Sequence, residues 1–366
     1  MRKINVSIVG TVGIPANYGG FETLVENLVI NQPDFINYTV FASSRNYKIK
    51  PKKYLKAKLK YLPFNANGIQ SIIYDIVSLV VASKNSDIIL LLGVSGATFL
   101  PIYKFFFPQI KIVTNIDGIE WKRNKWNTLV KKFLKISEKY AVKKSDYIIT
   151  DNKGIQDYVY STYGISTITI AYGANEINEP IKLRKYKDLK IKSNQYAFKV
   201  ARIEPENNIE MILNAFIGST IDIVFVGNWS NSLFGKSLFK KYSNYSNIHL
   251  LDPIYDIQSL NELRYNCLFY VHGHSAGGTN PSLVEAMALS LPVISFDVDF
   301  NRYTLNNNGI FFKSTIELKA ILKNITSYDL ENFGLNNLNY FKNNYSWNKI
   351  AKQYIDIFIN EKNDFK

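Results

Sequence analysis

The residues best suited to chemistry lie in one run of the chain, 272–287, which reads HGHSAGGTNPSLVEAM. The apolar runs on either side of it are typical of buried strands, and the part from Pro281 onward has the apolar spacing of a helix. We expect Thr279 or Asn280 to cap that helix. A glycine-rich turn between a strand and a helix leaves free backbone N–H groups, which bind anions. The run therefore predicts that Gly278, Thr279 and Asn280 hold a nucleotide diphosphate.

Two other residues of this run can take part in binding. Glu285 lies one helical turn further in, too far for the phosphates, but it is placed to accept hydrogen bonds from ribose hydroxyls. His274 follows the first apolar run and can lie near the same ligand. A single histidine after a strand is more often structural, so both interpretations of His274 stay open.

Further candidates follow other strand-like runs near the N-terminus. Gly19 and Gly20 begin a helical pattern and allow the backbone to approach a phosphate or a sugar closely, although a tight turn would use them equally well. Asp117 and Glu120 follow the buried run 111–116. Ligands of open parallel sheets bind outside the carboxyl ends of the strands, so these carboxylates are catalytic candidates. Their alternative role is a turn and a helix start.

Four runs, in the expected order, resemble motifs of family 4 of the glycosyltransferases, and within it the bacterial rhamnosyltransferase-like subgroup. They read GTVGIPANYGGFE (10–22), NIDGIEWKR (115–123), ARIEPENN (201–208) and GGTNPSLVEAM (277–287). The resemblance implies an α/β protein with two Rossmann-like, doubly wound parallel-sheet domains that face each other across a cleft, which is the GT-B fold.

The resemblance also implies roles for single residues. Arg202 matches the arginine that binds the leaving diphosphate, but Asn207 stands where the family commonly has a lysine. Glu285 matches the second of two glutamates of the family. Gly277 stands in place of the first, which recognises sugar hydroxyls in the family, so the donor sugar must be recognised differently here. Asp117 takes the place where many relatives have a histidine, and it is our candidate for a general base.

The alternation of strand-like and helical runs predicts two domains of the doubly wound type. The resemblance implies that residues 1–175 form an acceptor-binding domain and residues 176–345 a nucleotide-sugar-binding domain. Residues 346–366 contain an amphipathic helix, and the resemblance implies that it packs back on the first domain. Phe105, Phe106 and Phe107 lie in a very apolar run, for which we expect core packing; if these side chains are exposed, the alternative is insertion at a membrane interface.

Composition narrows the choice of function. The only cysteine, Cys267, falls in an apolar run and predicts a core residue, and no Cys/His cluster suggests zinc. We expect neither a metal nor another cofactor. The N-terminus lacks the pattern of a signal peptide and no run is long enough to span a membrane, so we expect a cytoplasmic protein.

The net charge of +14 is uneven, because residues 1–175 hold 23 Lys/Arg against 11 Asp/Glu. Seven lysines of this half lie between 48 and 60, in a run that predicts either an exposed loop or a surface that faces a membrane or an acceptor. Solvated lysines in a compositionally biased chain would explain the same excess.

The function implied is transfer of a hexosyl unit from a nucleoside-diphosphate sugar, with retained configuration. Our first choice is rhamnose from dTDP-rhamnose, passed to a lipid-linked saccharide at the inner face of a bacterial membrane in capsule, O-antigen or cell-wall polysaccharide assembly. The alternatives are another donor such as a UDP-hexose, an epimerase or phosphorylase of the same fold, and a non-catalytic basic module for membranes or nucleic acid. No aromatic RNA-binding motif occurs, so we expect no nucleic-acid partner.

Overall fold

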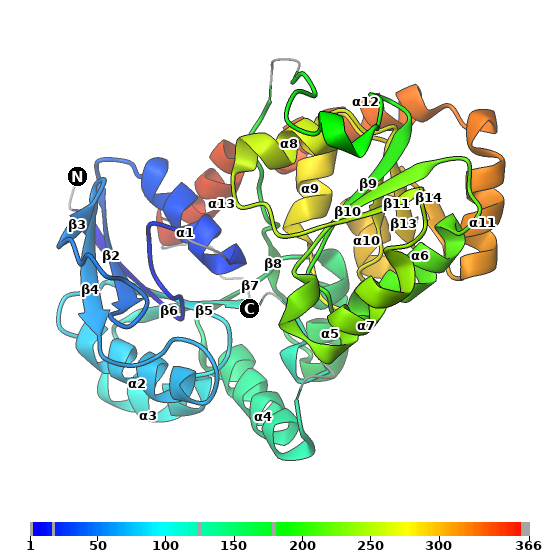
Figure 1. Ribbon diagram of the computed structural model, residues 1–366. Helices are drawn as coiled ribbons and strands as arrows, with labels where there is room; N and C mark the ends of the chain where they lie inside the picture. Colours follow the sequence, from blue (N-terminus) through cyan, green and yellow to red (C-terminus); the bar gives the residue numbers. More distant parts are fainter. Residues whose placement is uncertain (1–2, 17–18, 117, 123–125, 178–180, 360–366) are drawn as a thin grey trace. The chain divides into compact units, whose positions relative to one another are not determined.

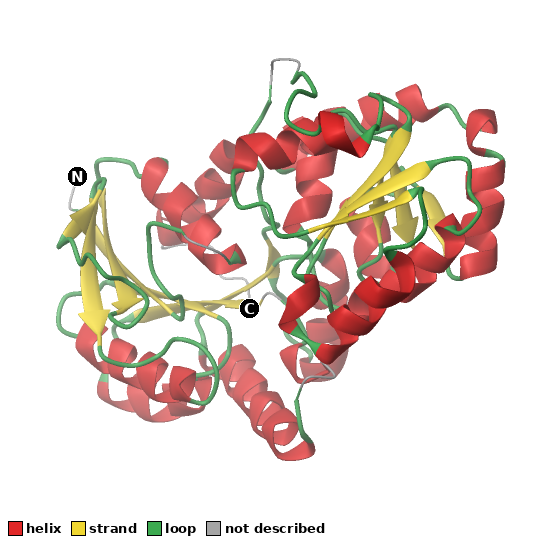
Figure 2. Ribbon diagram, in the orientation of Figure 1, coloured by secondary structure: helices red, strands yellow, loops and turns green. Residues whose placement is uncertain are grey.

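The computed structural model describes residues 3–16, 19–116, 118–122, 126–177 and 181–359. The chain divides into two compact units, of which the first joins residues 1–173 to 347–366 and the second spans 174–346. Each unit contains one open sheet with helices on both faces (Figure 1, Figure 2).

The first sheet has the strand order β3-β4-β2-β1-β5-β6-β7-β8, and every strand is parallel to its neighbours except β3, which is antiparallel to β4. The order reverses between β1 and β5, so the carboxyl ends of these two strands form the switch point at which ligands of such sheets bind. The strands are β1 (Ile4–Val9), β2 (Ile36–Ser43), β3 (Lys53–Tyr54), β4 (Ala57–Leu62), β5 (Ile88–Leu92), β6 (Lys111–Ile116), β7 (Tyr147–Thr150) and β8 (Ile168–Thr169).

Six α-helices accompany this sheet in the described part of the first unit. They are α1 (Gly20–Ile30), α2 (Gln70–Ala82), α3 (Leu100–Phe106), α4 (Thr128–Lys144), α5 (Lys153–Tyr163) and α13 (Trp347–Ile359). Figure 1 shows α1 and α13 on one face and α2, α3 and α4 on the other. The last helix belongs to this unit because Ile350, Tyr354 and Phe358 are buried in the same core cluster as the strand residues Ile8 and Leu90.

The second sheet is fully parallel and has the order β11-β10-β9-β12-β13-β14. Its order reverses between β9 and β12, which places the second switch point at their carboxyl ends. The strands are β9 (Tyr196–Val200), β10 (Asp222–Val226), β11 (Ile248–Leu251), β12 (Phe269–His272), β13 (Val293–Phe296) and β14 (Ile310–Phe312).

Helices cover both faces of the second sheet as well. They are α6 (Ile209–Phe216), α7 (Leu233–Tyr242), α8 (Ile257–Tyr265), α9 (Pro281–Ala288), α10 (Asp299–Thr304), α11 (Thr315–Lys323) and α12 (Leu330–Asn344). Figure 1 shows α6, α7 and α11 on one side and α8, α9 and α12 on the other. Cys267 is buried, as the sequence predicted.

Two expectations about the first unit were wrong. The basic run 48–60 is not a loop throughout, because it forms β3 and β4, and in β4 the exposed Lys58 and Lys60 alternate with buried apolar residues. Strand periodicity was present there but was hidden among the lysines. Phe105 and Phe106 do not pack in the core, since their exposed fractions are 80% and 65%. Among the described residues, no helix has both the length and the apolarity to span a membrane.

Candidate functional site

The loops that follow β9 and β12 are tied together at the switch point of the second sheet. The side-chain amide of Asn208 donates to the carbonyl oxygen of Gly273 at 2.8 Å. The backbone N–H of Ser275 donates to the carbonyl oxygen of Glu206 at 2.9 Å. A Cβ at position 273 would overlap the carbonyl oxygen of Asn207, so glycine is required for this close approach. The two loops therefore form one rigid platform above the strand ends.

Asn207, which stands in place of the family's lysine, has a structural task in this platform. Its Nδ2 donates to the carbonyl oxygen of Arg202 at 2.8 Å, which directs its Oδ1 toward Nδ1 of His274 at 3.0 Å. Because Oδ1 can only accept, Nδ1 of His274 is the donor. The Nε2 atom then points toward Gly277, 3.4 Å from where a Cβ would lie. The imidazole thus occupies the space beside the missing first glutamate.

The N-terminus of α9 is capped by Asn280, which decides between the two candidates for the cap. Its Oδ1 accepts from the backbone N–H of Ser282 at 3.1 Å and from the hydroxyl of Ser282 at 2.7 Å, and Pro281 occupies the first helical position. Gly277 has a φ of +108°, a conformation that favours glycine. The predicted turn from strand to helix is present, and Gly278, Thr279 and Asn280 lie in it.

Arg202 lies in the loop after β9 and has a half-exposed side chain. Its Nε is 3.9 Å from Oε2 of Glu204, a loose ion pair, and the side chain has an exposed fraction of 52%. The guanidinium can therefore turn toward a ligand at the strand ends without breaking a buried contact.

Glu285 is paired with a buried cation that no sequence motif singles out. Nη2 of Arg264, in the last turn of α8, donates to Oε2 of Glu285 at 2.5 Å. The arginine side chain is 2% exposed and that of the glutamate 34%. Arg264 was not among the predicted site residues, because a contact between α8 and α9 leaves no pattern in the sequence. The ion pair fixes one carboxylate oxygen of Glu285 on the protein side.

The predicted residues of the first unit lie at the other switch point. Gly19 is the N-cap of α1 and Gly20 its first residue. A Cβ at position 19 would overlap the carboxylate of Glu22, which accepts from the backbone N–H of Val12 at 2.9 Å and from the hydroxyl of Thr11 at 3.1 Å. Glu22 therefore fixes the loop after β1, and Gly19 makes room for it.

Glu120 lies in the short 3₁₀ turn Glu120–Lys122, where its Oε1 accepts from the indole Nε1 of Trp126 at 2.9 Å. Asp117 lies outside the described residues, so its distance to the other candidates is not defined. The structure thus brings together Arg202, Gly278, Thr279, Asn280 and Glu285 in one unit, and Gly19, Gly20 and Glu120 in the other.

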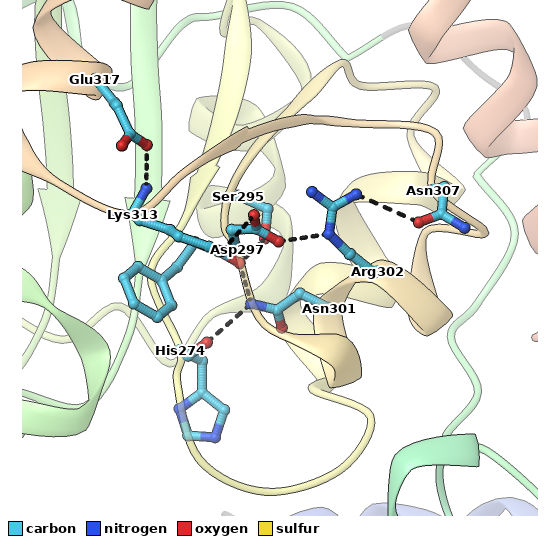
Figure 3. Close-up of polar contacts among 9 residues, drawn as sticks. His274, Ser295, Asp297, Asn301, Arg302, Asn307, Lys313 and Glu317 are labelled. Atoms are coloured by element: carbon cyan, nitrogen blue, oxygen red, sulfur yellow. Dashed lines mark hydrogen bonds and ion pairs between the residues drawn. The ribbon is translucent and has the colours of Figure 1, made fainter.

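One Asp-x-Asp pattern, which could suggest a metal site, occurs in the sequence at Asp297 and Asp299. Figure 3 shows Asp297 engaged by Arg302, with Lys313 on its other side at 3.5 Å. These cations hold the pKa of Asp297 below its usual value. Its carboxylate is thus already neutralised, and the described residues contain no group of three or more potential metal ligands.

The same close-up shows how α10 supports the platform. Nδ2 of Asn301 donates to the carbonyl oxygen of His274 at 2.8 Å and to that of Phe296 at 2.9 Å (Figure 3). Asn301 is 2% exposed, so these bonds are shielded from water. Neither α10 nor its contact with the loop was predicted.

Comparison with protein families divides the chain at nearly the same place as the structure. Residues 182–345 match the family "Glycosyl transferases group 1", and residues 3–175 match a domain of unknown function, DUF1972. The second unit therefore contains a glycosyltransferase group 1 domain. A curated relative, an uncharacterized glycosyltransferase of Methanocaldococcus jannaschii, is 25% identical over 240 residues, which cover 60% of this chain and only 60% of that protein. Together these matches support a transferase.

Solved structures share the fold across nearly the whole chain. Sucrose-phosphate synthase of Thermosynechococcus elongatus has a TM-score of 0.79 at 13% identity, covering 97% of this chain and 98% of that one. HepE of Anabaena, solved in complex with UDP, has a TM-score of 0.75 at 14% identity, covering 98% and 99%. The predicted fold class, two Rossmann-like parallel-sheet domains of the GT-B type, is confirmed.

The ion pair of Glu285 and Arg264 gives a prediction about stability. Glu285→Gln should lower the free energy of unfolding by about 3 kcal/mol, because it leaves the buried guanidinium without its counter-charge. In an Arg264→Met background the same substitution should cost much less. Urea unfolding of the four proteins of this cycle measures the difference, with Glu317→Gln as a control at an exposed carboxylate of the same unit. If the double variant loses the sum of the stabilities that the two single variants lose, Glu285 and Arg264 are not coupled.

Proposed function

We propose that this protein is a retaining glycosyltransferase that moves a hexosyl unit from a nucleoside-diphosphate sugar to a hydroxyl of a saccharide acceptor. The observation that carries the proposal is the set of groups around the ends of β9 and β12. A half-exposed arginine, a capped helix N-terminus and a glutamate with one oxygen fixed lie there, in the domain that matches the glycosyltransferase family.

The division of labour in this proposal follows from the chemistry of each group. The backbone N–H groups of Gly278, Thr279 and Asn280 bind the diphosphate at the positive end of α9. Arg202 holds two of its oxygens and stabilises the charge that develops as it leaves. Glu285 accepts hydrogen bonds from the ribose hydroxyls, while Arg264 orients its carboxylate.

The remaining steps concern the acceptor. Asp117 stays our candidate for the base that takes the proton of the acceptor hydroxyl, and the leaving phosphate is the alternative acceptor of that proton. Glu120 stays a second catalytic candidate, and the indole N–H of Trp126 orients one oxygen of its carboxylate. Gly19 and Gly20 leave the backbone of the first unit open to close approach by a phosphate or a sugar.

We propose a 6-deoxyhexose such as rhamnose, carried by dTDP, as the donor. Gly277 removes the carboxylate that would bind sugar hydroxyls, and His274 presents an imidazole beside that space. A UDP-hexose is the alternative donor, since the similar fold of HepE was solved with UDP-glucose. The two donors differ in base and sugar, so direct binding measurements distinguish them.

We further propose that the acceptor is lipid-linked and that the protein binds the inner face of a bacterial membrane. Ile102, Phe105 and Phe106 are exposed on α3, which packs against α4. The neighbouring α4 carries exposed lysines, namely Lys132, Lys135, Lys139, Lys143 and Lys144. Exposed aromatic rings beside a cationic helix suit an anionic bilayer surface, to which each lysine contributes about 1 kcal/mol of attraction.

The diphosphate site gives the test of the activity. In a thermal-shift panel of nucleoside diphosphates and their sugars, a ligand at about 100 times its Kd should add about 2.7 kcal/mol of stability. With the donor found in this way, Arg202→Ala should lose turnover by orders of magnitude, and Arg202→Lys should regain only part, because an ammonium cannot make the bidentate contact. Arg184→Ala, at an exposed arginine of the same unit, is the control. Near-normal turnover of Arg202→Ala would mean that the diphosphate binds elsewhere.

A second prediction concerns metal ions. The proposal assigns neutralisation of the diphosphate to Arg202 and the α9 amides, so turnover should persist after exhaustive chelation. The measurement is the initial rate with EDTA, with and without added Mg²⁺ or Mn²⁺. Loss of turnover with EDTA and its rescue by either ion would assign that neutralisation to a metal.

A third prediction concerns the membrane. The protein should co-sediment with vesicles that contain anionic phospholipid, and the bound fraction should fall as salt is raised. Replacing both Phe105 and Phe106 by Ser should weaken binding, whereas Leu233→Ser, at a leucine that is 86% exposed on the second unit, should not. Equal binding to neutral vesicles, or binding to neither, would make the acceptor a soluble saccharide.

A further inference from the structure

A lysine lies buried at the second switch point without a partner. Lys199 is the fourth of the five residues of β9 and is 1% exposed. Its Nζ makes no hydrogen bond or ion pair with any residue that the structure describes, and it lies 5.4 Å from the ring centroid of Phe225. The same atom is 3.1 Å from the position that a Cβ of residue 273 would occupy. The ammonium group therefore ends directly beneath the platform formed by the two loops.

The fold itself gives no reason for a charged group at this position. Lys199 alternates along β9 with Phe198 and Val200, and so shares a face with Ala197, whose core cluster includes Ile212 and Phe225. An apolar side chain would fill this place without the cost of burying an amine that has no acceptor. Burial lowers the pKa of Lys199 to about 7, with no opposing carboxylate.

The titratable neighbours of Lys199 are basic or distant. His272 and His274 lie on β12 and on the loop after it. Burial, and after it the charge of Lys199, lowers the pKa of His272 well below its usual value. On the loop after β9, Arg202 is half-exposed and pairs loosely with Glu204. On α6, Glu210 is paired with Lys241. No carboxylate of the described chain is thus placed to neutralise the amine.

The place of Lys199 in the topology indicates which group compensates the charge of its ammonium form. The strand order reverses between β9 and β12, and ligands of open parallel sheets bind at that point, beyond the carboxyl ends. Lys199 is near the end of one of these strands, and Gly273 directly follows the other. The same loops carry Arg202 and Asn207, where the family's arginine and lysine bind the diphosphate. Asn207 is uncharged and committed to Arg202 and His274, so one cation is missing from the surface of the site.

We propose that Lys199 supplies this missing cation, compensating the charge of the bound diphosphate from beneath Gly273 rather than from position 207. The inference rests on the proposed function. Gly273 has no side chain to separate the ammonium from a ligand on the platform, and a charge acts strongly across the poorly polarisable layer between them. Lys199 is therefore a charge-compensating residue, and it needs no direct contact with the phosphate oxygens.

A consequence is proton uptake on binding. At pH 8 the amine of the ligand-free protein is mostly neutral, because its pKa is about 7. A diphosphate above it favours the charged form and raises that pKa. Binding should then take up as much as about one proton per site, and affinity should fall as pH rises from 7 to 9.

The stability of the ligand-free protein should change with pH in the opposite direction to its affinity for the diphosphate. The pKa of Lys199 is lower in the folded protein than the usual 10.5, so the unfolded chain binds more protons between about pH 7 and 10.5. The lysine therefore destabilises the fold most at and below pH 7, and this cost is relieved as pH rises toward 10.5. Replacing it by Met should leave the ligand-free protein as stable at neutral pH as before, or more stable.

Isothermal titration calorimetry with UDP and with dTDP, at pH 8 in buffers of different ionisation enthalpy, tests the proposal on the full chain. Relative to the wild type, Lys199→Met should bind at least tenfold more weakly at pH 7 and take up fewer protons at pH 8, with a Tm that is unchanged or higher. Lys323→Met, at an exposed lysine of α11, should match the wild type in all three measurements.

The possible outcomes are distinct. Unchanged affinity and unchanged proton uptake in folded Lys199→Met would overturn the role of Lys199 while leaving the proposed function intact. Absence of binding of either nucleotide to the wild type would overturn the proposed function and this inference with it. If Lys199→Met does not fold, the wild type alone decides, because an affinity that does not change from pH 7 to 9 excludes a neutral amine that becomes charged on binding.

Discussion

The constraint on which this structure depends is the burial of parallel strands on both faces. A strand such as β5 or β12 is covered by helices on either side, so its side chains have no access to water except at its ends. Polar and charged groups must therefore gather at the strand ends or find partners inside. In both units the groups suited to chemistry lie in loops that begin where a strand ends, and their arrangement follows from how those loops satisfy their own hydrogen bonds.

The two switch points meet this constraint differently. In the first unit the loop after β1 is closed by the protein itself, since Glu22 binds Thr11 and Val12 and is 8% exposed. In the second unit the loops after β9 and β12 bind each other instead, through Asn208 and Ser275. Both ring nitrogens of His272, at the end of β12, and the Nε of Arg264 have no hydrogen-bond partner among the described residues. The neutral imidazole offers one donor and one acceptor and the guanidinium one donor, so hydrogen-bonding groups of both kinds remain open in this unit.

The pair of Glu285 and Arg264 illustrates how a motif depends on residues outside it. The position of Glu285 within α9 already separates it from the helix N-terminus, which leaves the phosphates to the backbone. What the motif does not contain is the cation that orients the carboxylate, and this cation comes from α8, 21 residues earlier. Asn301 plays the same part for the loop, since it fixes the carbonyl of His274 from α10.

Local patterns in the sequence were enough to predict several features. The strand β5 is a continuous apolar run, β6 and β7 are largely apolar, and the glycine-rich turn with Asn280 and Pro281 carries its own capping chemistry, so these elements were predictable. Short or mixed elements were not: β4 lies between β2 and the two-residue strand β3 and its lysines mask its alternation, and α10 has only six residues. Their formation depends on the sheet against which they pack.

Which groups meet depends on the tertiary fold, because the contacts join distant parts of the chain. The exposure of Phe105 and Phe106, the contact of Asn207 with His274, the pairing of Arg264 with Glu285 and the isolation of Lys199 all join residues from different elements. A lysine inside an apolar strand gives no sign in the sequence of whether it reaches water or stays buried. That depends on how far the strand lies from the sheet edge and on what covers its end, and here Gly273 and the loops above it keep the amine from solvent. The physical reason is that the free energy of a polar group is set by its surroundings, and those surroundings are assembled from distant parts of the chain.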